Sequence, residues 1–225
     1  FKRIYEDDIN GTISHERFLK LSAEYEAEQK ELTEAIARRL FVELEASGRH
    51  VHVTEQQAEI LFGHGLTPER PLSQPGQYLA RERVTVRGPK GSFEHVAVLG
   101  PERKEAQVEL SLTDARVLGI QAPVRLSGDT ADTPGAELMG PRGRVTLSQG
   151  VIAAKRHVHL TPEAAKTFGV TDGQNVKLRA LTARPVIFED VAIRVSPQFA
   201  PYAHLDYDEA NACGFQKGDF GRILP

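Results

Sequence analysis

The sequence has a single cysteine and no long apolar run, and these shortages exclude several classes of protein. Because Cys213 is the one cysteine in 225 residues, neither an internal disulfide nor a cysteine-rich zinc site can form. No apolar stretch approaches the roughly 18 residues that a membrane-spanning helix needs, and the first residues contain no secretory signal. The net charge of −3 provides no excess of basic residues for nucleic acid or an anionic membrane. We therefore expect a cytoplasmic protein that binds no nucleic acid and no membrane.

Several familiar catalytic motifs are also missing. The sequence contains no Gly-x-Ser-x-Gly elbow, Walker loop, dinucleotide-binding fingerprint or His-Glu-x-x-His helix. Serine hydrolases, P-loop nucleotide hydrolases, Rossmann enzymes and zincin proteases are therefore not leading candidates. A catalytic site has to come from another arrangement of residues.

The residues after Leu40 show the alternation that is typical of β-strands. Short valine-rich segments such as Val84–Arg87 and Val191–Val195 alternate apolar and polar residues, and turns such as Gly88–Gly91 separate them. Many short strands with a few short helices favour barrels or sandwiches. The pattern places short helices, with threonine N-caps on the first and third, at residues 54–62, 113–118, 161–168 and 208–213.

The first 36 residues differ from the rest by their density of charge. Residues 24–39 predict a charged helix with a weak apolar stripe. A solvated helical tail is the simplest interpretation of this segment. An appended interaction or targeting helix is the alternative.

An internal repeat is the most informative feature of the sequence. Arg49–Thr54 matches Arg156–Thr161 at an offset of 107 residues, and Phe93–Val98 matches Phe188–Ile193 at an offset of 95. The second offset also aligns Leu118 with Cys213, so we interpret Cys213 as a core residue and not as a nucleophile. The chain therefore consists of two related β units after the charged segment.

The repeat assembles two candidate metal sites. Residues i and i+2 of a strand point to the same face about 6.6 Å apart, so each His-x-His pair can converge on one ion. A lone His-x-His is more often a surface or core pair, but two equivalent copies favour ligation. The offset of 95 residues provides one further ligand for each unit. The two sets, whose division between the ions stays open, are His50, His52 and Glu109, and His157, His159 and His204.

Three ligands leave an open coordination position, which is the pattern of catalytic rather than structural zinc. Arg103 lies six residues before Glu109. A guanidinium beside a metal can bind phosphate through two hydrogen bonds and neutralise charge in a transition state. A solvent-exposed turn residue is an equally good interpretation of Arg103 from spacing alone.

With these motifs, residues from about Leu40 to Ile223 resemble the PduL-type phosphotransacylases, the phosphate propanoyltransferases of bacterial microcompartments. The segments that carry the resemblance are Arg49–His52, Pro71–Gln77, Leu99–Glu109, Ala122–Arg125, Arg156–His159 and Asp206–Gly214.

The resemblance implies a mainly β protein of two related small β-barrels with short helices, plus the charged N-terminal helix. Residues 1–36 would form the tail, 37–46 with 155–225 one barrel, and 47–154 the other. It further implies two zinc ions on the six ligands above, Arg103 as the catalytic arginine, and a contact between Asn211 and coenzyme A.

The activity implied is the reversible conversion of propanoyl-CoA, and of acetyl-CoA as a further substrate, with inorganic phosphate to acyl phosphate and CoA. The alternatives are a dinuclear zinc hydrolase of thioesters or phosphoesters and a non-enzymatic zinc-stabilised assembly module. Partners in a microcompartment shell or lumen would follow from the family, and a homo-oligomer stays open. The charged tail departs from the amphipathic encapsulation peptide of many members, which leaves a lumenal location open as well. Cobalt, nickel or iron are alternatives to zinc.

Overall fold

The computed structural model describes residues 5, 8–39 and 41–224, without the side chains of residues 31–39. The chain divides into two compact units, Phe1–Phe41 and Val42–Pro225. In the first unit, α2 (His15–Arg39) is a helix of 25 residues that begins nine residues before the predicted start. Ser14 explains the earlier start, because its hydroxyl accepts a hydrogen bond from the backbone N–H of Arg17 at 3.3 Å.

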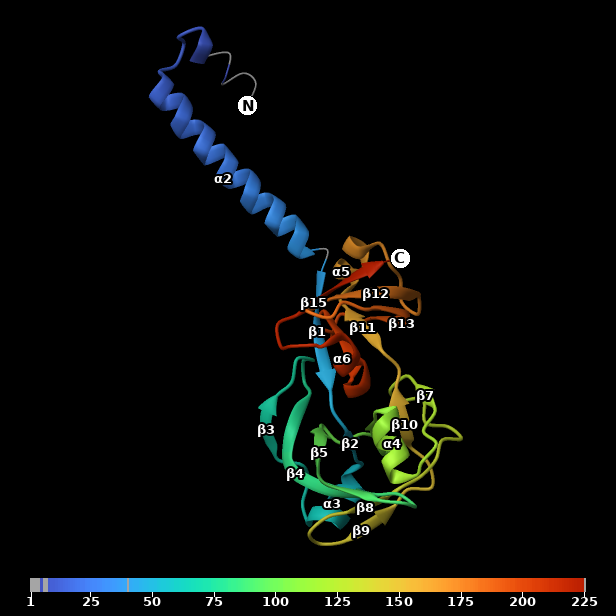
Figure 1. Cartoon of the computed structure of the whole chain (residues 1–225). Coiled ribbons are helices and arrows are strands. Elements are labelled where there is room, and N and C mark those ends of the chain that lie inside the picture. The colour runs from blue at the N-terminus through green and yellow to red at the C-terminus, as the bar shows by residue number, and fades with distance from the viewer. Residues whose placement is uncertain (1–4, 6–7, 40, 225) are drawn as a thin grey trace. The chain divides into compact units, whose positions relative to one another are not determined.

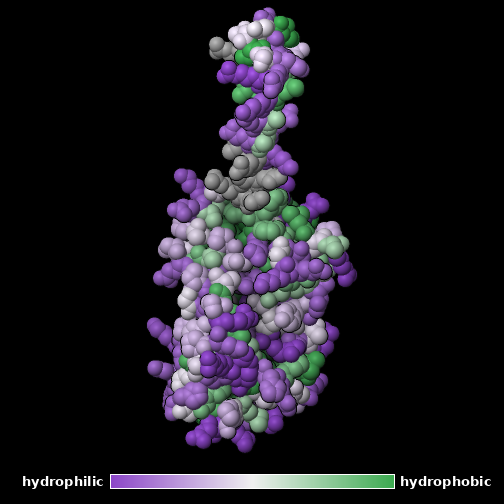
Figure 2. All heavy atoms as spheres, turned by 90° about the vertical axis from the view of Figure 1, so that its left-hand side faces the viewer, coloured by the Kyte–Doolittle hydropathy of each residue, from purple (hydrophilic) through white to green (hydrophobic). Residues whose placement is uncertain are grey.

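The predicted charged helix is confirmed. Hydrophilic side chains predominate along the visible face of α2, with apolar side chains scattered among them (Figure 2). Within the part of the chain that the structure describes, no helix combines the length and the apolarity needed to cross a membrane.

A closed barrel forms one part of the second unit. Its first strand follows directly after the N-terminal helix and pairs in parallel with a strand near the C-terminus (Figure 1). In ring order, the barrel consists of β1 (Phe41–Ser47), β14 (Tyr202–Asp206), β11 (His157–Leu160), β13 (Ile187–Val195), β12 (Asn175–Leu181) and β15 (Phe220–Leu224).

Alternation along these strands builds the barrel core. In β12, Val176, Leu178 and Ala180 are buried, while the residues between them are exposed. This period of two directs one row of side chains inward and the other to solvent. Leu178 is fully buried and Leu181, on the same strand, is 41% exposed.

The other sheet curls into half a barrel around its own core. Its path has two ends, at β7 and β9, whereas the barrel closes on itself. One further strand, β3 (Pro68–Pro71), pairs with β4 beside this path. The path runs through β7 (Val124–Arg125), β10 (Val151–Ala154), β6 (Gln107–Leu110), β2 (His50–His52), β5 (Ser92–Gly100), β4 (Tyr78–Arg87), β8 (Glu137–Met139) and β9 (Arg144–Thr146).

The four predicted short helices are confirmed, each with a polar N-cap and a glycine C-cap in the left-handed region. Thr54 and Thr161 cap the first and third of them, as expected. The helices are α3 (Glu55–Phe62), α4 (Leu112–Leu118), α5 (Pro162–Phe168) and α6 (Tyr207–Cys213).

The repeat in the sequence is a repeat of strand pairing. β2 runs parallel to β5 and antiparallel to β6, while β11 runs parallel to β13 and antiparallel to β14. The mainly β fold of two related strand units with short helices is therefore confirmed. Both sheets belong to one compact unit. The division into domains at 37–46 with 155–225 and at 47–154 stays a prediction.

Truncation of Leu178 tests the barrel core. We expect Leu178→Ala to lower the free energy of unfolding by about 2–5 kcal/mol, because it removes buried apolar contacts and leaves a cavity. Leu181→Ala, on the exposed face of the same strand, should change it by less than about 0.5 kcal/mol. Urea unfolding followed by circular dichroism measures both variants, and equal losses would contradict the assignment of the core.

Candidate metal and active site

A cavity of about 540 Å³ is lined by residues from both sheets. All six predicted ligand residues line it, and so does Arg103. The two His-x-His pairs lie on β2 and β11, which are the equivalent strands of the two related units. The fold thus brings the two candidate metal sites to one cavity.

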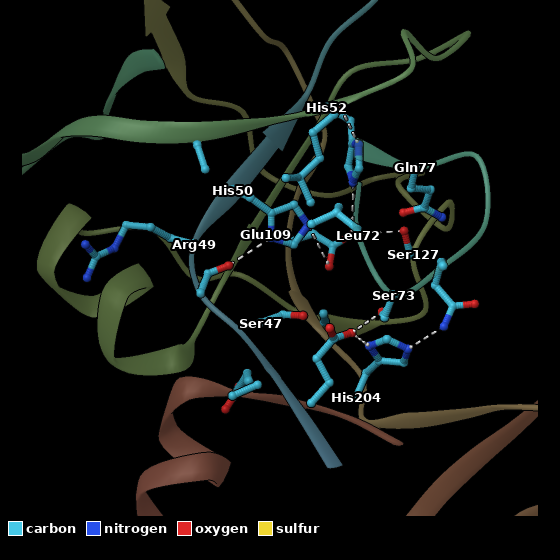
Figure 3. Close-up of a pocket in the computed structure, with 18 of the residues that line it drawn as sticks. Ser47, Arg49, His50, His52, Leu72, Ser73, Gln77, Glu109, Ser127 and His204 are labelled. Atoms are coloured by element: carbon cyan, nitrogen blue, oxygen red, sulfur yellow. Dashed lines mark hydrogen bonds and ion pairs between the residues drawn. The ribbon is translucent and has the colours of Figure 1, made fainter. Parts of the chain in front are cut away.

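The first cluster joins β2 to β6. His50 lies directly opposite Glu109 in the antiparallel register. The Nε2 atom of His50 lies 3.5 Å from Oε2 of Glu109, and Nε2 of His52 lies 3.9 Å from Oε1 of the same carboxylate. All three side chains are buried, and Figure 3 shows them pointing toward one another. The spacing of these atoms is suitable for three ligands of one ion.

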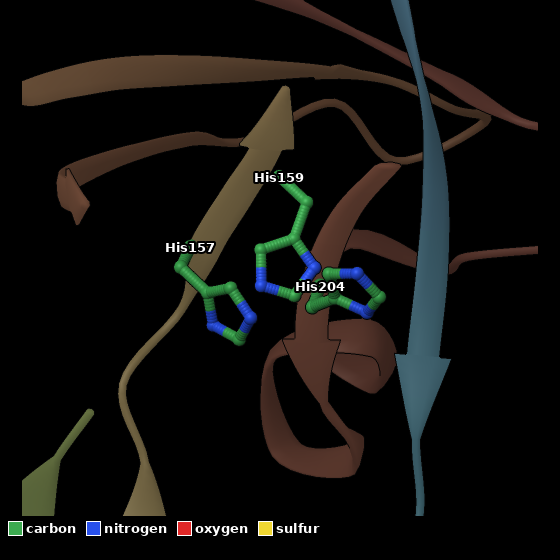
Figure 4. Close-up of side chains that lie close together, drawn as sticks. All are labelled: His157, His159 and His204. Atoms are coloured by element: carbon green, nitrogen blue, oxygen red, sulfur yellow. The ribbon is translucent and has the colours of Figure 1, made fainter. Parts of the chain in front are cut away.

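The second cluster repeats this arrangement between β11 and β14. His157 lies opposite His204 in the antiparallel register, as His50 does opposite Glu109. The ring centroids of His157, His159 and His204 lie 4.6 to 4.9 Å apart. Figure 4 shows the three imidazoles gathered side by side. In each cluster the ligand atoms lie within 4.8 Å of one another.

Hydrogen bonds to the backbone orient three of these rings. Nδ1 of His50 lies 2.8 Å from the carbonyl of Gly48, and Nδ1 of His157 lies 2.8 Å from that of Lys155. His52 makes the same kind of contact, at 3.2 Å, with the carbonyl of Leu99. Since a carbonyl only accepts, each Nδ1 donates, and the lone pair of a neutral ring lies on Nε2. This arrangement is typical of histidines that bind a metal through Nε2.

His159 provides the test of whether a metal fits. Both of its ring nitrogens are buried without a hydrogen-bond partner. A buried polar atom without a partner costs free energy, and a ligated metal ion would remove that cost at one nitrogen. The nitrogen and carboxylate donors of both clusters are also the types that zinc binds. The residues present therefore fit two divalent ions.

Burial keeps most of these imidazoles neutral. It lowers the pKa of His52 to about 3, with help from the neighbouring His50, and that of His157 to about 3, with help from His204. Burial and His157 lower the pKa of His159 to about 2. Neutral imidazole is the form that binds metal, so these side chains are ready to ligate at neutral pH.

His50 and Glu109 behave differently because they form an ion pair. Burial alone would lower the pKa of His50, but the carboxylate of Glu109 outweighs burial, and the pKa is raised. Burial would likewise raise the pKa of Glu109, but His50 lowers it far below its ordinary value. The carboxylate is therefore ionised and available as a ligand.

A polar network connects Arg103 to the first cluster. Nη1 of Arg103 donates to the hydroxyl of Ser127 at 3.1 Å, and this hydroxyl donates to Oε1 of Glu109 at 2.9 Å. The side-chain amide of Gln107 donates to both Ser127 and Glu109. The backbone N–H of Arg103 donates to the backbone carbonyl of Val53, the residue that follows β2. This hydrogen bond holds the loop between β5 and β6, which contains Arg103, beside the end of β2. The structure thus holds Arg103 at the cavity.

Sequence analysis missed three polar residues of this cavity region. Ser127 lies outside the repeat and outside every segment that carries the resemblance. Gln107 lies within one such segment, Leu99–Glu109, but was not singled out as a site residue. Arg194 lies next to His159 in the parallel register of β11 and β13, and it lines the cavity. Its only signal in the sequence is its position in the strand that follows the second His-x-His pair.

Two further residues named by sequence analysis lie elsewhere. Asn211 is exposed on α6 and is not among the residues that line the cavity. Its contact with coenzyme A stays a prediction. Cys213 is fully buried in the barrel core, and burial raises the pKa of its thiol. The interpretation of Cys213 as a core residue is confirmed.

Comparison with known proteins connects this geometry to a family. A family model described as phosphate propanoyltransferase matches residues 43–216. A phosphate propanoyltransferase of Enterococcus faecalis is 57% identical over 184 residues, which are 81% of this chain and 87% of the relative. That of Listeria monocytogenes is 51% identical over 199 residues, or 86% and 93%. That of Thermotoga maritima is 51% identical over 181 residues, or 79% and 86%.

The match covers the half-barrel sheet and the barrel except for β15 and the first two residues of β1, and it includes all six candidate ligands and Arg103. The identity extends over most of each relative, so it reflects the whole fold and not a shared fragment. The chain therefore belongs to the phosphate propanoyltransferase family of acyltransferases.

Proposed function

We propose that this protein transfers a short acyl group reversibly between coenzyme A and inorganic phosphate, with a divalent metal ion in each histidine cluster. The observation that carries the proposal is the convergence of both clusters and Arg103 on one cavity, in a chain of this family. Propanoyl-CoA is the first substrate to test, and acetyl-CoA the second.

The ligands of the two ions would be the six clustered residues. Their imidazole and carboxylate donors favour zinc, with cobalt, nickel and iron as alternatives. When bound, such ions supply Lewis-acid stabilisation of negative charge on the thioester oxygen or the departing thiolate. The metal identity and the count of two are parts of the proposal.

Arg103 would bind phosphate. Ser127 accepts one of its hydrogen bonds and faces Glu109, so the guanidinium is held near the first cluster while other N–H groups stay available. Arg194 adds a second positive charge at the cavity. A guanidinium offers two parallel donors to a phosphate, which orients the nucleophile as well as attracting it.

The chemical step needs no covalent acyl-enzyme. A phosphate oxygen attacks the thioester carbonyl carbon, the carbon–sulfur bond breaks, and the sulfur leaves with the electron pair as a thiolate. The products are acyl phosphate and CoA, and the reverse reaction follows the same path. Cys213, the one thiol of the chain, is buried in the barrel core and is not a nucleophile here. Orientation and charge neutralisation are the contributions we assign to the protein.

Location and assembly belong to the same proposal. Membership of the family suggests the lumen of a bacterial microcompartment and contact with its shell or lumen enzymes. The N-terminal segment is highly charged, unlike the amphipathic encapsulation peptide of many members, so the proposal leaves the role of α2 and a lumenal location open.

The phosphate dependence of thiol release tests the activity. Purified protein is incubated with propanoyl-CoA, and free thiol and acyl phosphate are measured with and without phosphate. We expect release only with phosphate, and loss of release after treatment with a chelator. Thiol release without phosphate would instead favour the dinuclear hydrolase. No release from propanoyl-CoA or acetyl-CoA by metal-loaded protein would contradict the transferase.

Replacement of Arg103 tests its assigned role. We expect Arg103→Ala to lower kcat by about 10²–10³-fold, the usual cost of losing one group that stabilises transition-state charge. Arg103→Lys should recover only part of the loss, because lysine lacks the planar pair of donors. Arg116→Ala, at an exposed arginine on α4, is the matched control. Unchanged turnover in Arg103→Ala, with an unchanged melting temperature, would remove Arg103 from the mechanism.

Acid should destabilise the metal-free protein. In the unfolded chain His52, His157 and His159 bind protons below pH 6.5, whereas in the folded chain they stay neutral down to about pH 3 or below. The raised pKa of His50 acts in the opposite direction, but on one ring against three. The unfolded state therefore binds more protons as the pH falls from 7.5 to 5.5, and stability decreases, by about 1 kcal/mol per histidine at pH 5.5.

Urea unfolding at several pH values, at constant ionic strength, measures this dependence. His157→Gln should flatten the slope between pH 7.5 and 5.5, because one of the three rings with a lowered pKa is gone. His64→Gln, at an exposed histidine outside both clusters, is the control. Equal slopes in the wild type and in His157→Gln would contradict the neutral, buried state of His157.

A further inference from the structure

His204 differs from the other four candidate histidine ligands in the group that its Nδ1 atom contacts. The Nδ1 atoms of His50, His52 and His157 contact backbone carbonyls, and neither nitrogen of His159 has a partner. Nδ1 of His204 instead lies 3.1 Å from the carboxylate oxygen Oε2 of Glu45. A side chain can be changed by mutation, whereas a backbone carbonyl cannot, so this contact is open to a direct test.

The backbone places Glu45 and His204 together. Glu45 on β1 is the register partner of His204 on the parallel strand β14. The His204 side chain is 12% exposed and that of Glu45 is 34% exposed, so the contact is shielded but not sealed from water. A carboxylate only accepts hydrogen bonds, so Nδ1 of His204 is the donor and the lone pair of the neutral ring lies on Nε2.

A second residue holds the Glu45 carboxylate from the other sheet. The hydroxyl of Ser73, in the segment between β3 and β4, donates to the same Oε2 atom at 2.6 Å. Ser73 and His204 lie close together in Figure 3. The carboxylate thus receives one hydrogen bond from the ligand histidine and one from a loop of the half-barrel sheet. Two donors on one oxygen restrict the rotamer of Glu45 more than either would alone.

The neighbouring Gln74 anchors this loop to the barrel. Its side-chain oxygen accepts from the N–H of Ala200 at 3.2 Å, and its amide nitrogen donates to the Ala200 carbonyl at 3.1 Å. This pair fixes which atom of the amide is nitrogen. That nitrogen lies 3.4 Å from Nε2 of His204, a long contact in which the Nε2 lone pair accepts. A metal ion bound at Nε2 would take the place of this contact.

We propose that Glu45 is the positioning residue of the second cluster, fixing His204 in the tautomer whose Nε2 carries the lone pair, so that this atom can bind a metal ion shared with His157 and His159. Ser73 supports it by holding the carboxylate in place. The inference rests on the proposed function, because it takes the second cluster to be a metal site. A carboxylate behind a ligand histidine raises the basicity of the ring and so its affinity for metal.

The expected effect is confined to one of the two metal sites. Glu45 contacts His204, while the ligands of the first cluster are oriented by Gly48 and Leu99. Loss of such a supporting group costs about 10–100-fold in metal affinity. Mutation of Glu45 should therefore weaken one zinc equivalent and leave the other as it was.

Zinc titration of the metal-free protein against a chromophoric chelator measures both sites without reference to activity. For the wild type we expect two equivalents. Glu45→Gln should bind one of them about 10–100-fold more weakly, and Ser73→Ala should weaken the same equivalent by a smaller factor. The matched control is Glu43→Gln, two residues away on the same face of β1, whose register partner is Tyr202 and not a histidine. It should leave both equivalents unchanged.

The outcomes separate this inference from the proposed function. Fewer than two equivalents in the wild type would overturn the proposed pair of metal sites, and this inference with it. Two equivalents in the wild type with unchanged affinities in Glu45→Gln would overturn the role of Glu45 alone. Equal weakening of both equivalents, or the same weakening in Glu43→Gln, would show a general structural effect and also overturn it. If Glu45→Gln does not fold, Ser73→Ala decides, because an unchanged second site in that variant contradicts the inference.

Discussion

The register of two antiparallel strand pairs is the constraint on which the site depends. In each unit the first histidine of the His-x-His pair faces the third candidate ligand directly across the ladder, His50 opposite Glu109 and His157 opposite His204. A slip of one residue would turn every side chain of the strand to the other face of the sheet. The core enforces the register, because Val51 and Val158, between the two histidines of each pair, are fully buried. The packing of these valines on one face of the strand thus fixes the register that brings the candidate ligands together on the other face.

This arrangement has a cost that a metal ion offsets. The structure places five imidazoles and a carboxylate around one cavity, and His159 has no hydrogen-bond partner there. Desolvation keeps His52, His157 and His159 neutral. A protein that only needed stability would fill such positions with apolar side chains. The polar cluster is therefore best explained by what it binds, and the same burial that weakens the metal-free fold prepares the ligands.

The sequence allowed the candidate ligands to be predicted because they recur. His50, His52, His157 and His159 stand at one offset and Glu109 and His204 at another, so each copy supports the interpretation of its counterpart. The short helices were predictable for a local reason, namely their polar N-caps, two of which are threonines, and the glycines that end them. Ser127, Glu45 and Arg194 could not be found in this way, because each reaches the cavity through pairing between distant segments. Closure of one sheet into a barrel, and the two free ends of the other sheet, also depend on pairing between distant strands. The spacing of residues along the sequence does not predict that pairing.

The place of β1 in the barrel has a consequence for how the chain is made. Its pairing partner β14 begins at Tyr202, about 155 residues after β1 ends at Ser47, whereas every strand of the half-barrel sheet lies between residues 50 and 154. During synthesis at about 5–20 residues per second, β1 leaves the ribosome roughly 8–30 seconds before its partner exists. The half-barrel sheet has all its strands while β1 still exposes an unpaired edge. The order of translation thus completes the cluster of His50, His52 and Glu109 first, and the cluster containing His204 only when the last strands arrive.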